Sequence, residues 1–132
     1  MVDLVLVLEG IRKGYKMISP VMGLDLSPNS TGLSIHLVDG SHFTTAIIAK
    51  INNPEKFNTS DRIRIEKSIL VVDQIISYWE DYDCPEHIFI ENYAFGANNV
   101  VVQAELGGMV KEALSCREDL PTFHMVGIQG LG

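Results

Sequence analysis

Apolar residues fall into short runs along the first part of the chain, and these runs predict β-strands. Three of them follow one another closely, at residues 21–26, 32–38 and 42–48. A Ser-Pro-Asn turn at 27–29 separates the first two, and an Asp-Gly dipeptide at 39–40, typical of two-residue hairpin turns, precedes the third. Because such short connections join antiparallel neighbours, the three runs predict an antiparallel meander.

A helical pattern follows over residues 61–82. Its apolar residues recur at spacings of three and four and predict one continuous stripe, formed by Ile65, Ile69, Val72, Ile76 and Trp79. Thr59 or Ser60 is the expected N-cap, since a hydroxyl there can accept a hydrogen bond from the first turn. The acidic stretch around Pro85 ends the helix.

The remaining pattern gives a strand at 87–91, a second helix over about 100–115 and a last strand at 122–128. The order β-β-β-α-β-α-β places the chain in the α/β class. Connections of helical length favour parallel crossovers, so we expect a mixed five-stranded sheet in the order 3-2-1-4-5 with helices on its faces. Residues 1–18 are interpreted as an appendage of unknown role, and residues 19–132 as one domain.

Two carboxylates stand out because each ends an apolar strand. Asp25 ends VMGLD, and Glu91 ends HIFIE just before a polar loop that contains glycine. Burying an unpaired carboxylate costs several kcal/mol. Chemistry in open α/β sheets gathers beyond the carboxyl ends of strands, and adjacent strands lie ~4.8 Å apart. Two carboxylates this close repel unless a proton or cation lies between them, and Mg²⁺ prefers carboxylate oxygens. The pair therefore indicates a metal-dependent phosphodiesterase site.

Each acid taken alone has a simpler interpretation. Asp25 can be a turn-capping residue that accepts hydrogen bonds from the backbone of the following turn. Glu91 can simply mark the point where a strand meets water. The joint pattern of a strand ending in Asp, a hairpin, a long helix and a strand ending in Glu favours the catalytic interpretation.

Other polar and aromatic residues near these acids are candidates for substrate contacts. Ser27, Asn29 and Ser30 offer hydroxyl and amide groups to a phosphate, although ordinary turn formation explains them equally well. Tyr93 and Phe95 follow Glu91 and can stack on a splayed base or form a local hydrophobic plug. The basic residues at the start of the first helix (Arg62, Arg64 and Lys67) touch phosphate or, in the interpretation we favour, form a solvated helix face.

Composition limits the choice of function. A chain of 132 residues supports a single core, and no apolar run approaches the ~18–20 residues that span a bilayer. The net charge of −7 argues against sequence-blind affinity for nucleic acid. Cys84 and Cys116 suggest thiols in a reducing cytoplasm, and the four histidines (His36, His42, His87 and His124) show no spacing typical of a metal site.

The motif MGLDLSPNSTGLSI, the helix RIRIEKSILVVDQIISYW and the later IFIENYAFGANN resemble the corresponding elements of RuvC-type Holliday-junction resolvases, in the RNase H-like superfamily. The resemblance covers about residues 20–128. It implies that Asp25 and Glu91 are catalytic and hold Mg²⁺ or Mn²⁺, that branched DNA is the substrate and that the protein forms a homodimer. These resolvases carry further acids in a C-terminal helix. We therefore expect residues 19–132 to be an incomplete nuclease domain with weak or no activity.

Two alternatives stay open. GLDLSPNSTG also resembles the first phosphate-binding hairpin of actin-like ATPases and sugar kinases, in which small polar residues meet the nucleotide. Those proteins carry a second glycine-rich phosphate loop, which we do not find in this sequence. The other alternative is a DNA-binding remnant that keeps an RNase H-like fold without the chemistry.

Overall fold

The structure of the protein is a computed structural model, and it describes residues 20–52, 59–91, 100–117 and 120–126. The predicted appendage at 1–18 lies outside these ranges, so the domain boundary at residue 19 stays a prediction. In the described ranges, no helix combines the length and the apolar character needed to cross a membrane.

Within these ranges, five strands and two helices follow one another in the predicted order. The strands are β1 (Val21–Asp25), β2 (Thr31–His36), β3 (His42–Ile47), β4 (His87–Glu91) and β5 (Thr122–Val126), and the helices are α2 (Ser60–Asp81) and α3 (Val100–Ser115). Their bounds differ from the predicted ones by at most two residues. Hydrophobic periodicity was therefore sufficient to locate these elements along the chain.

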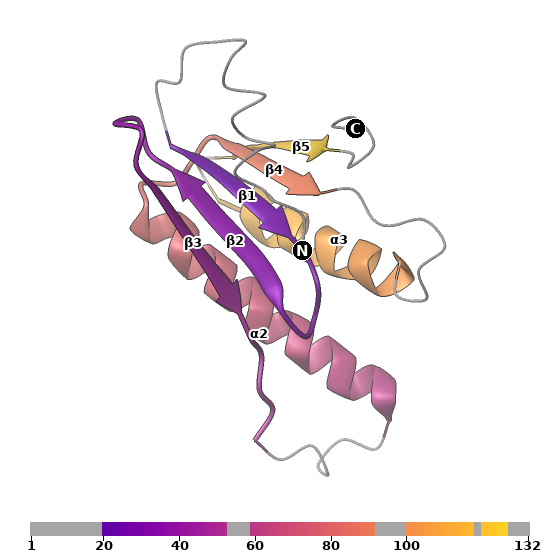
Figure 1. The fold of residues 1–132 in the computed structure, drawn as a ribbon. Coiled ribbons are helices and arrows are strands. Elements are labelled where there is room, and N and C mark those ends of the chain that lie inside the picture. The colour runs from indigo at the N-terminus through magenta and orange to yellow at the C-terminus, as the bar shows by residue number, and fades with distance from the viewer. Residues whose placement is uncertain (1–19, 53–58, 92–99, 118–119, 127–132) are drawn as a thin grey trace.

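The strands form one mixed sheet in the order β3-β2-β1-β4-β5, which confirms the predicted order (Figure 1). β1 pairs with β2, and β2 with β3, in antiparallel fashion, whereas β4 is parallel to both β1 and β5. In the centre, Leu24 of β1 lies between Leu33 of β2 and Ile90 of β4. β1 and β4 are thus the two strands that carry the predicted acids, and they are neighbours.

Both helices cover the same face of this sheet (Figure 1). Alternate strand residues point toward the helices and form the main core together with the buried sides of α2 and α3. This core includes Met22, Leu24, Leu33, Ile35, Val71, Ile75, Ile88, Ile90, Leu106 and Val110. The other strand residues point away from α2 and α3, to what we call the second face. There Val21 and Phe89 form a separate buried cluster, against which Val126 packs.

The buried stripe of α2 differs from the predicted one. Thr59 is the N-cap as expected, and its hydroxyl accepts a hydrogen bond from the Arg62 amide at 3.1 Å. The buried residues are Ser68, Val71, Val72, Ile75 and Trp79. Ile69, a member of the predicted apolar stripe, is 40% exposed. The helix is apolar on more than one side in this region, so periodicity alone left its rotation about its own axis uncertain.

Trp79 connects α2 to the strand that follows it. Its indole N–H donates to the buried carbonyl of Pro85 at 2.9 Å, and the Cys84 amide donates to the carbonyl of Trp79. Asp83 and Cys84 both have positive φ, so the backbone reverses within a few residues. Because the helix ends in this tight turn, only a few residues separate α2 from β4, the strand that ends at Glu91.

The β2–β3 connection is longer than the predicted two-residue turn. Residues 37–41 separate the two strands, and within them the Gly40 amide donates to the Leu37 carbonyl at 3.0 Å. Gly40 takes a φ of +92°, and the Asp39 carboxylate accepts from the Ser41 amide at 2.8 Å. The Asp-Gly pair does make the turn and β3 starts at His42 as predicted, whereas β2 ends at His36, two residues before the predicted end.

The corrected stripe of α2 can be tested with the same substitution at two positions. Ile75→Ala is expected to lower the free energy of unfolding by about 2–5 kcal/mol, because it leaves a cavity in the main core. Ile69→Ala on the neighbouring side of the helix is expected to cost less than about 1 kcal/mol. Urea denaturation of the two variants measures this difference. Equal losses would mean that the buried side of α2 has been assigned wrongly.

Candidate active site

Asp25 and Glu91 lie at the same edge of the sheet, on neighbouring parallel strands. The register pairs Leu24 with Ile90, and the two acids are the next residue of each strand. Leu24 and Ile90 both belong to the main core on the helix side. Because successive strand residues point to opposite faces, both carboxylates point to the second face. The two side chains are therefore on one face, at adjacent positions.

The surroundings of the two carboxylates disfavour their charges. Burial raises the pKa of Glu91 to about 7, and the negative charge of Asp25 adds to this shift. Burial also raises the pKa of Asp25. The Oε2 atom of Glu91 is buried and accepts no hydrogen bond from the described residues. Two neighbouring carboxylates with raised pKa values are a place where a proton or a cation lowers the free energy.

The residues present fit a hard cation. Carboxylate oxygens are the ligands that Mg²⁺ and Mn²⁺ prefer, and Mg²⁺ in particular retains water in several of its coordination positions. Within the described ranges, no group of three or more His, Cys, Asp or Glu side chains is placed to hold a metal ion. Within these ranges, Asp25 and Glu91 could supply two carboxylate ligands to such a cation.

The turn after β1 is held together by its own side chains. The Thr31 hydroxyl donates to the carbonyl of Ser27 at 2.6 Å and accepts from the Ser27 amide at 3.1 Å. The Asn29 amide points to the Ser27 hydroxyl at 3.4 Å, while Ser30 is exposed. The backbone N–H groups of Ser27 and Asn29, which a phosphate would use, thus already donate hydrogen bonds within the turn. A substrate role for Ser27, Asn29 and Ser30 stays a prediction.

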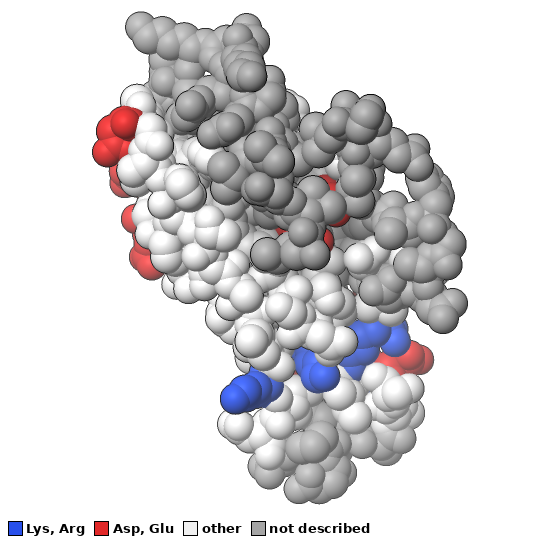
Figure 2. Space-filling view, viewed as in Figure 1, with Lys and Arg blue, Asp and Glu red and all other residues white. Residues whose placement is uncertain are grey.

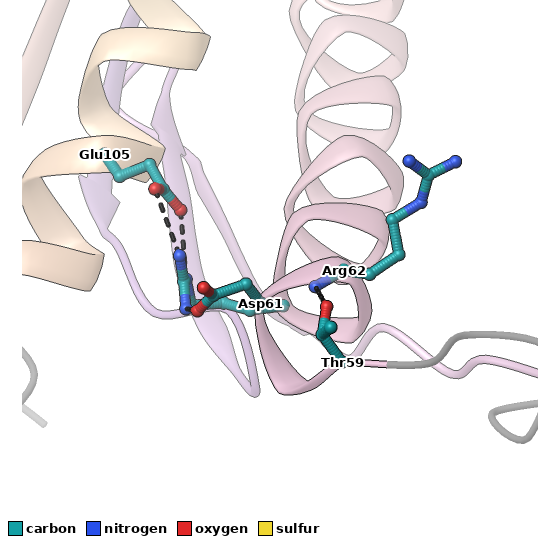
Figure 3. A network of polar contacts seen from close by, with 5 residues as sticks. Thr59, Asp61, Arg62 and Glu105 are labelled. Atoms are coloured by element: carbon teal, nitrogen blue, oxygen red, sulfur yellow. Dashed lines mark hydrogen bonds and ion pairs between the residues drawn. The ribbon is translucent and has the colours of Figure 1, made fainter.

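The basic residues of α2 are paired within the protein. Arg64 makes two hydrogen bonds to the Glu105 carboxylate of α3, at 3.1 and 3.3 Å, and one to Asp61 at 2.6 Å (Figure 3). These partners raise the pKa of Arg64 still further. Lys67 donates to the side-chain oxygen of Asn29 at 3.2 Å and so connects α2 to the β1–β2 turn. Our interpretation of a merely solvated helix face was therefore incomplete.

Glu105 was not identified from the sequence, because its partner lies 41 residues earlier in the chain. Figure 2 shows Lys and Arg side chains in a band across the lower part of the view, where Figure 1 places the β1–β2 turn and the first half of α2. Tyr93 and Phe95, the predicted stacking residues, lie outside the described residues.

Comparison with known proteins gives evidence for the fold. No protein-family model matches the sequence, and no curated protein matches it. Among solved structures, Thermus thermophilus RuvC matches with a TM-score of 0.60 at 17% identity, covering 82% of this chain and 63% of RuvC. T. thermophilus RuvC in complex with a Holliday junction substrate matches with a TM-score of 0.59 at 12% identity, covering 84% of this chain and 66% of RuvC.

The chain thus spans about two thirds of the length of both RuvC structures. At such identities the similarity bears on the fold alone, and it agrees with the strand order β3-β2-β1-β4-β5 described above. The protein has the RNase H-like fold of the RuvC structures, as the sequence resemblance predicted.

Proposed function

We propose that the protein is a metal-dependent endonuclease that cuts phosphodiester bonds in branched DNA. The observation that carries this proposal is the carboxylate pair of Asp25 and Glu91, side by side on parallel strands and both with a raised pKa. A fold shared with RuvC, one structure of which contains a Holliday junction substrate, supports branched DNA as the ligand. A homodimer, which would match the symmetry of a four-way junction, is part of the proposal.

In this proposal Asp25 and Glu91 bind Mg²⁺ or Mn²⁺ through their carboxylate oxygens. When bound, the cations activate a water and stabilise the charge that develops on the phosphate. The partial burial of the two acids would strengthen the electrostatic interactions at the site. The Ser27 and Ser30 hydroxyls and the Asn29 side-chain amide, rather than the engaged backbone amides of the turn, would donate to the phosphate backbone. Tyr93 and Phe95 would stack on a base.

We also propose that this activity belongs to the cytoplasm. The chain has two cysteines, Cys84 and Cys116, without the spacing of metal ligands, and thiols persist in reducing compartments. The nucleotide-binding alternative gains no support from the described geometry, because the turn amides that would meet a phosphate are engaged by Thr31 and Ser27.

Metal binding is expected to be weak and to depend on both acids. Asp25→Asn should weaken Mn²⁺ binding at least about tenfold, or about 1.4 kcal/mol, because it removes one of two charged ligands. Asp73→Asn, an exposed acid on α2, is the matched control and should change nothing. Isothermal titration calorimetry with Mn²⁺ measures both. Unchanged Mn²⁺ affinity in Asp25→Asn would refute the site.

The same titration should depend on pH in a definite direction. Metal binds the ionised carboxylates, and the pKa of Glu91 is about 7 in the metal-free protein. Below pH 7 a proton competes with the cation for Glu91, so Mn²⁺ affinity should rise between pH 6 and pH 8 and then level off. In Glu91→Gln this rise should largely disappear. An affinity that falls with increasing pH would contradict the assigned ligands.

Activity should be measurable on a labelled four-way junction with Mg²⁺ or Mn²⁺. We expect slow nicking, because two carboxylates leave a second cation short of ligands and lost electrostatic stabilisation costs about 10³-fold in rate. Asp25→Asn and Glu91→Gln should each abolish it, whereas Asp73→Asn should not. Binding of the junction and of a linear duplex is compared by gel shift. Nicking that survives both acid substitutions, or equal affinity for the two DNAs, would exclude the proposed function.

A further inference from the structure

The four histidines of the chain, which sequence spacing did not connect, lie on the second face of the sheet. His36 pairs with His42 across β2 and β3, and both His36 and His87 pair with Val21 of β1. Val21 belongs to the separate cluster of the second face, so residues level with it point to the same side. His124 on β5 points there too, since it stacks on Phe89 of that cluster. Strand pairing therefore gathers imidazole rings from four different strands.

Two of these rings meet through their nitrogens. The Nδ1 atom of His87 and the Nε2 atom of His124 are 2.9 Å apart, and the ring centroids are 5.2 Å apart. The Phe89 ring stacks on the His124 ring, with centroids 4.5 Å apart and an interplanar angle of 19°. Both histidine side chains are half-buried. The pair is thus positioned by the β4–β5 pairing and by an aromatic neighbour.

This separation suits a transition metal held by two imidazoles. Zinc binds imidazole nitrogen at about 2.0–2.1 Å with tetrahedral angles, which puts two ring centroids about 5.2 Å apart and the two nitrogens about 3.3 Å apart. The centroids of His87 and His124 already have that spacing. The nitrogens would have to separate by about 0.4 Å, and at the present centroid spacing a tetrahedral angle at the metal requires each ring to turn by roughly 35°. Side-chain torsions rather than strand movements would supply this turn.

We propose that His87 Nδ1 and His124 Nε2 form a binding site for a divalent transition ion of the zinc type. Without metal, one of the two nitrogens carries a proton and donates it to the other in a hydrogen bond. On binding, that ring moves its proton to its second nitrogen, so both rings stay neutral and both lone pairs reach the metal. Water or a ligand from outside completes the coordination.

The proposed site is distinct from the acid pair in place and in chemistry. His87 begins β4 and Glu91 ends it, so the two residues are about 13 Å apart along the strand. Imidazole nitrogen suits Zn²⁺, Ni²⁺ and Cu²⁺, whereas carboxylate oxygen suits Mg²⁺. One strand would thus carry a nitrogen site for a borderline ion at its start and an oxygen site for a hard ion at its end.

The other histidine pair is a natural control. His36 and His42 stack face to face, with centroids 5.5 Å apart and an interplanar angle of 21°. Ring faces rather than nitrogens meet there, so this pair is not arranged to chelate. His42 is exposed on β3, and replacing it should disturb the fold little.

The test is a Zn²⁺ titration in saturating Mg²⁺, which keeps the acid pair occupied, followed through the imidazole signals by nuclear magnetic resonance. Zn²⁺ should shift the signals of His87 and His124 together, before those of His36 and His42. By calorimetry, His87→Phe and His124→Phe should each raise the Kd for Zn²⁺ at least about tenfold, because one of two ligands is lost. His42→Phe should leave the Kd unchanged.

Two results would overturn the proposal. One is that the signals of His87 and His124 do not move at saturating Zn²⁺. The other is that His42→Phe loses as much affinity as His87→Phe, which would indicate scattered surface binding. The spectra of the unaltered chain decide the question even if a Phe variant does not fold.

Discussion

Parallel pairing of β1 with β4 is the constraint on which the rest of the structure depends. It places Leu24 beside Ile90 in the main core and, one residue later, Asp25 beside Glu91 on the second face. Side chains alternate along each strand, so a slip of one residue in either strand would bring a carboxylate into the apolar core. The burial of the core thus enforces the geometry of the acid pair.

This geometry places two carboxylates that repel each other on β1 and β4, two neighbouring strands in the middle of the sheet. Burial raises the pKa of both acids, and the charge of Asp25 adds to the shift of Glu91. Such a pair is unfavourable for the folded protein by itself, and a proton or a cation would reduce the repulsion. Perturbed carboxylates that lie close together are typical of catalytic sites, which is why this pair supports the proposed function.

The two faces of the sheet differ in the side chains that they carry. The helix side is packed with aliphatic residues and is fixed by contacts between elements, such as the Arg64–Glu105 ion pair and the hydrogen bond from Trp79 to Pro85. The second face carries the ionisable side chains, with the carboxylates at one end of β4 and imidazoles at the other. The proposed sites thus lie on the opposite side of the sheet from the contacts that hold α2 and α3 in place.

The sequence by itself determined the elements, the order of the strands and the two acids at strand ends. Those features follow from local periodicity, short turns and crossover rules, which act within a few residues or along one connection. Tertiary structure alone decided which side of α2 is buried, because that helix has apolar residues on more than one side and only the packing partners select among them. It also decided the contacts of Arg64 with Glu105 and of His87 with His124, which join residues 41 and 37 positions apart. Such pairs leave no periodic signal, since they are brought together by strand pairing and helix packing rather than by spacing along the chain.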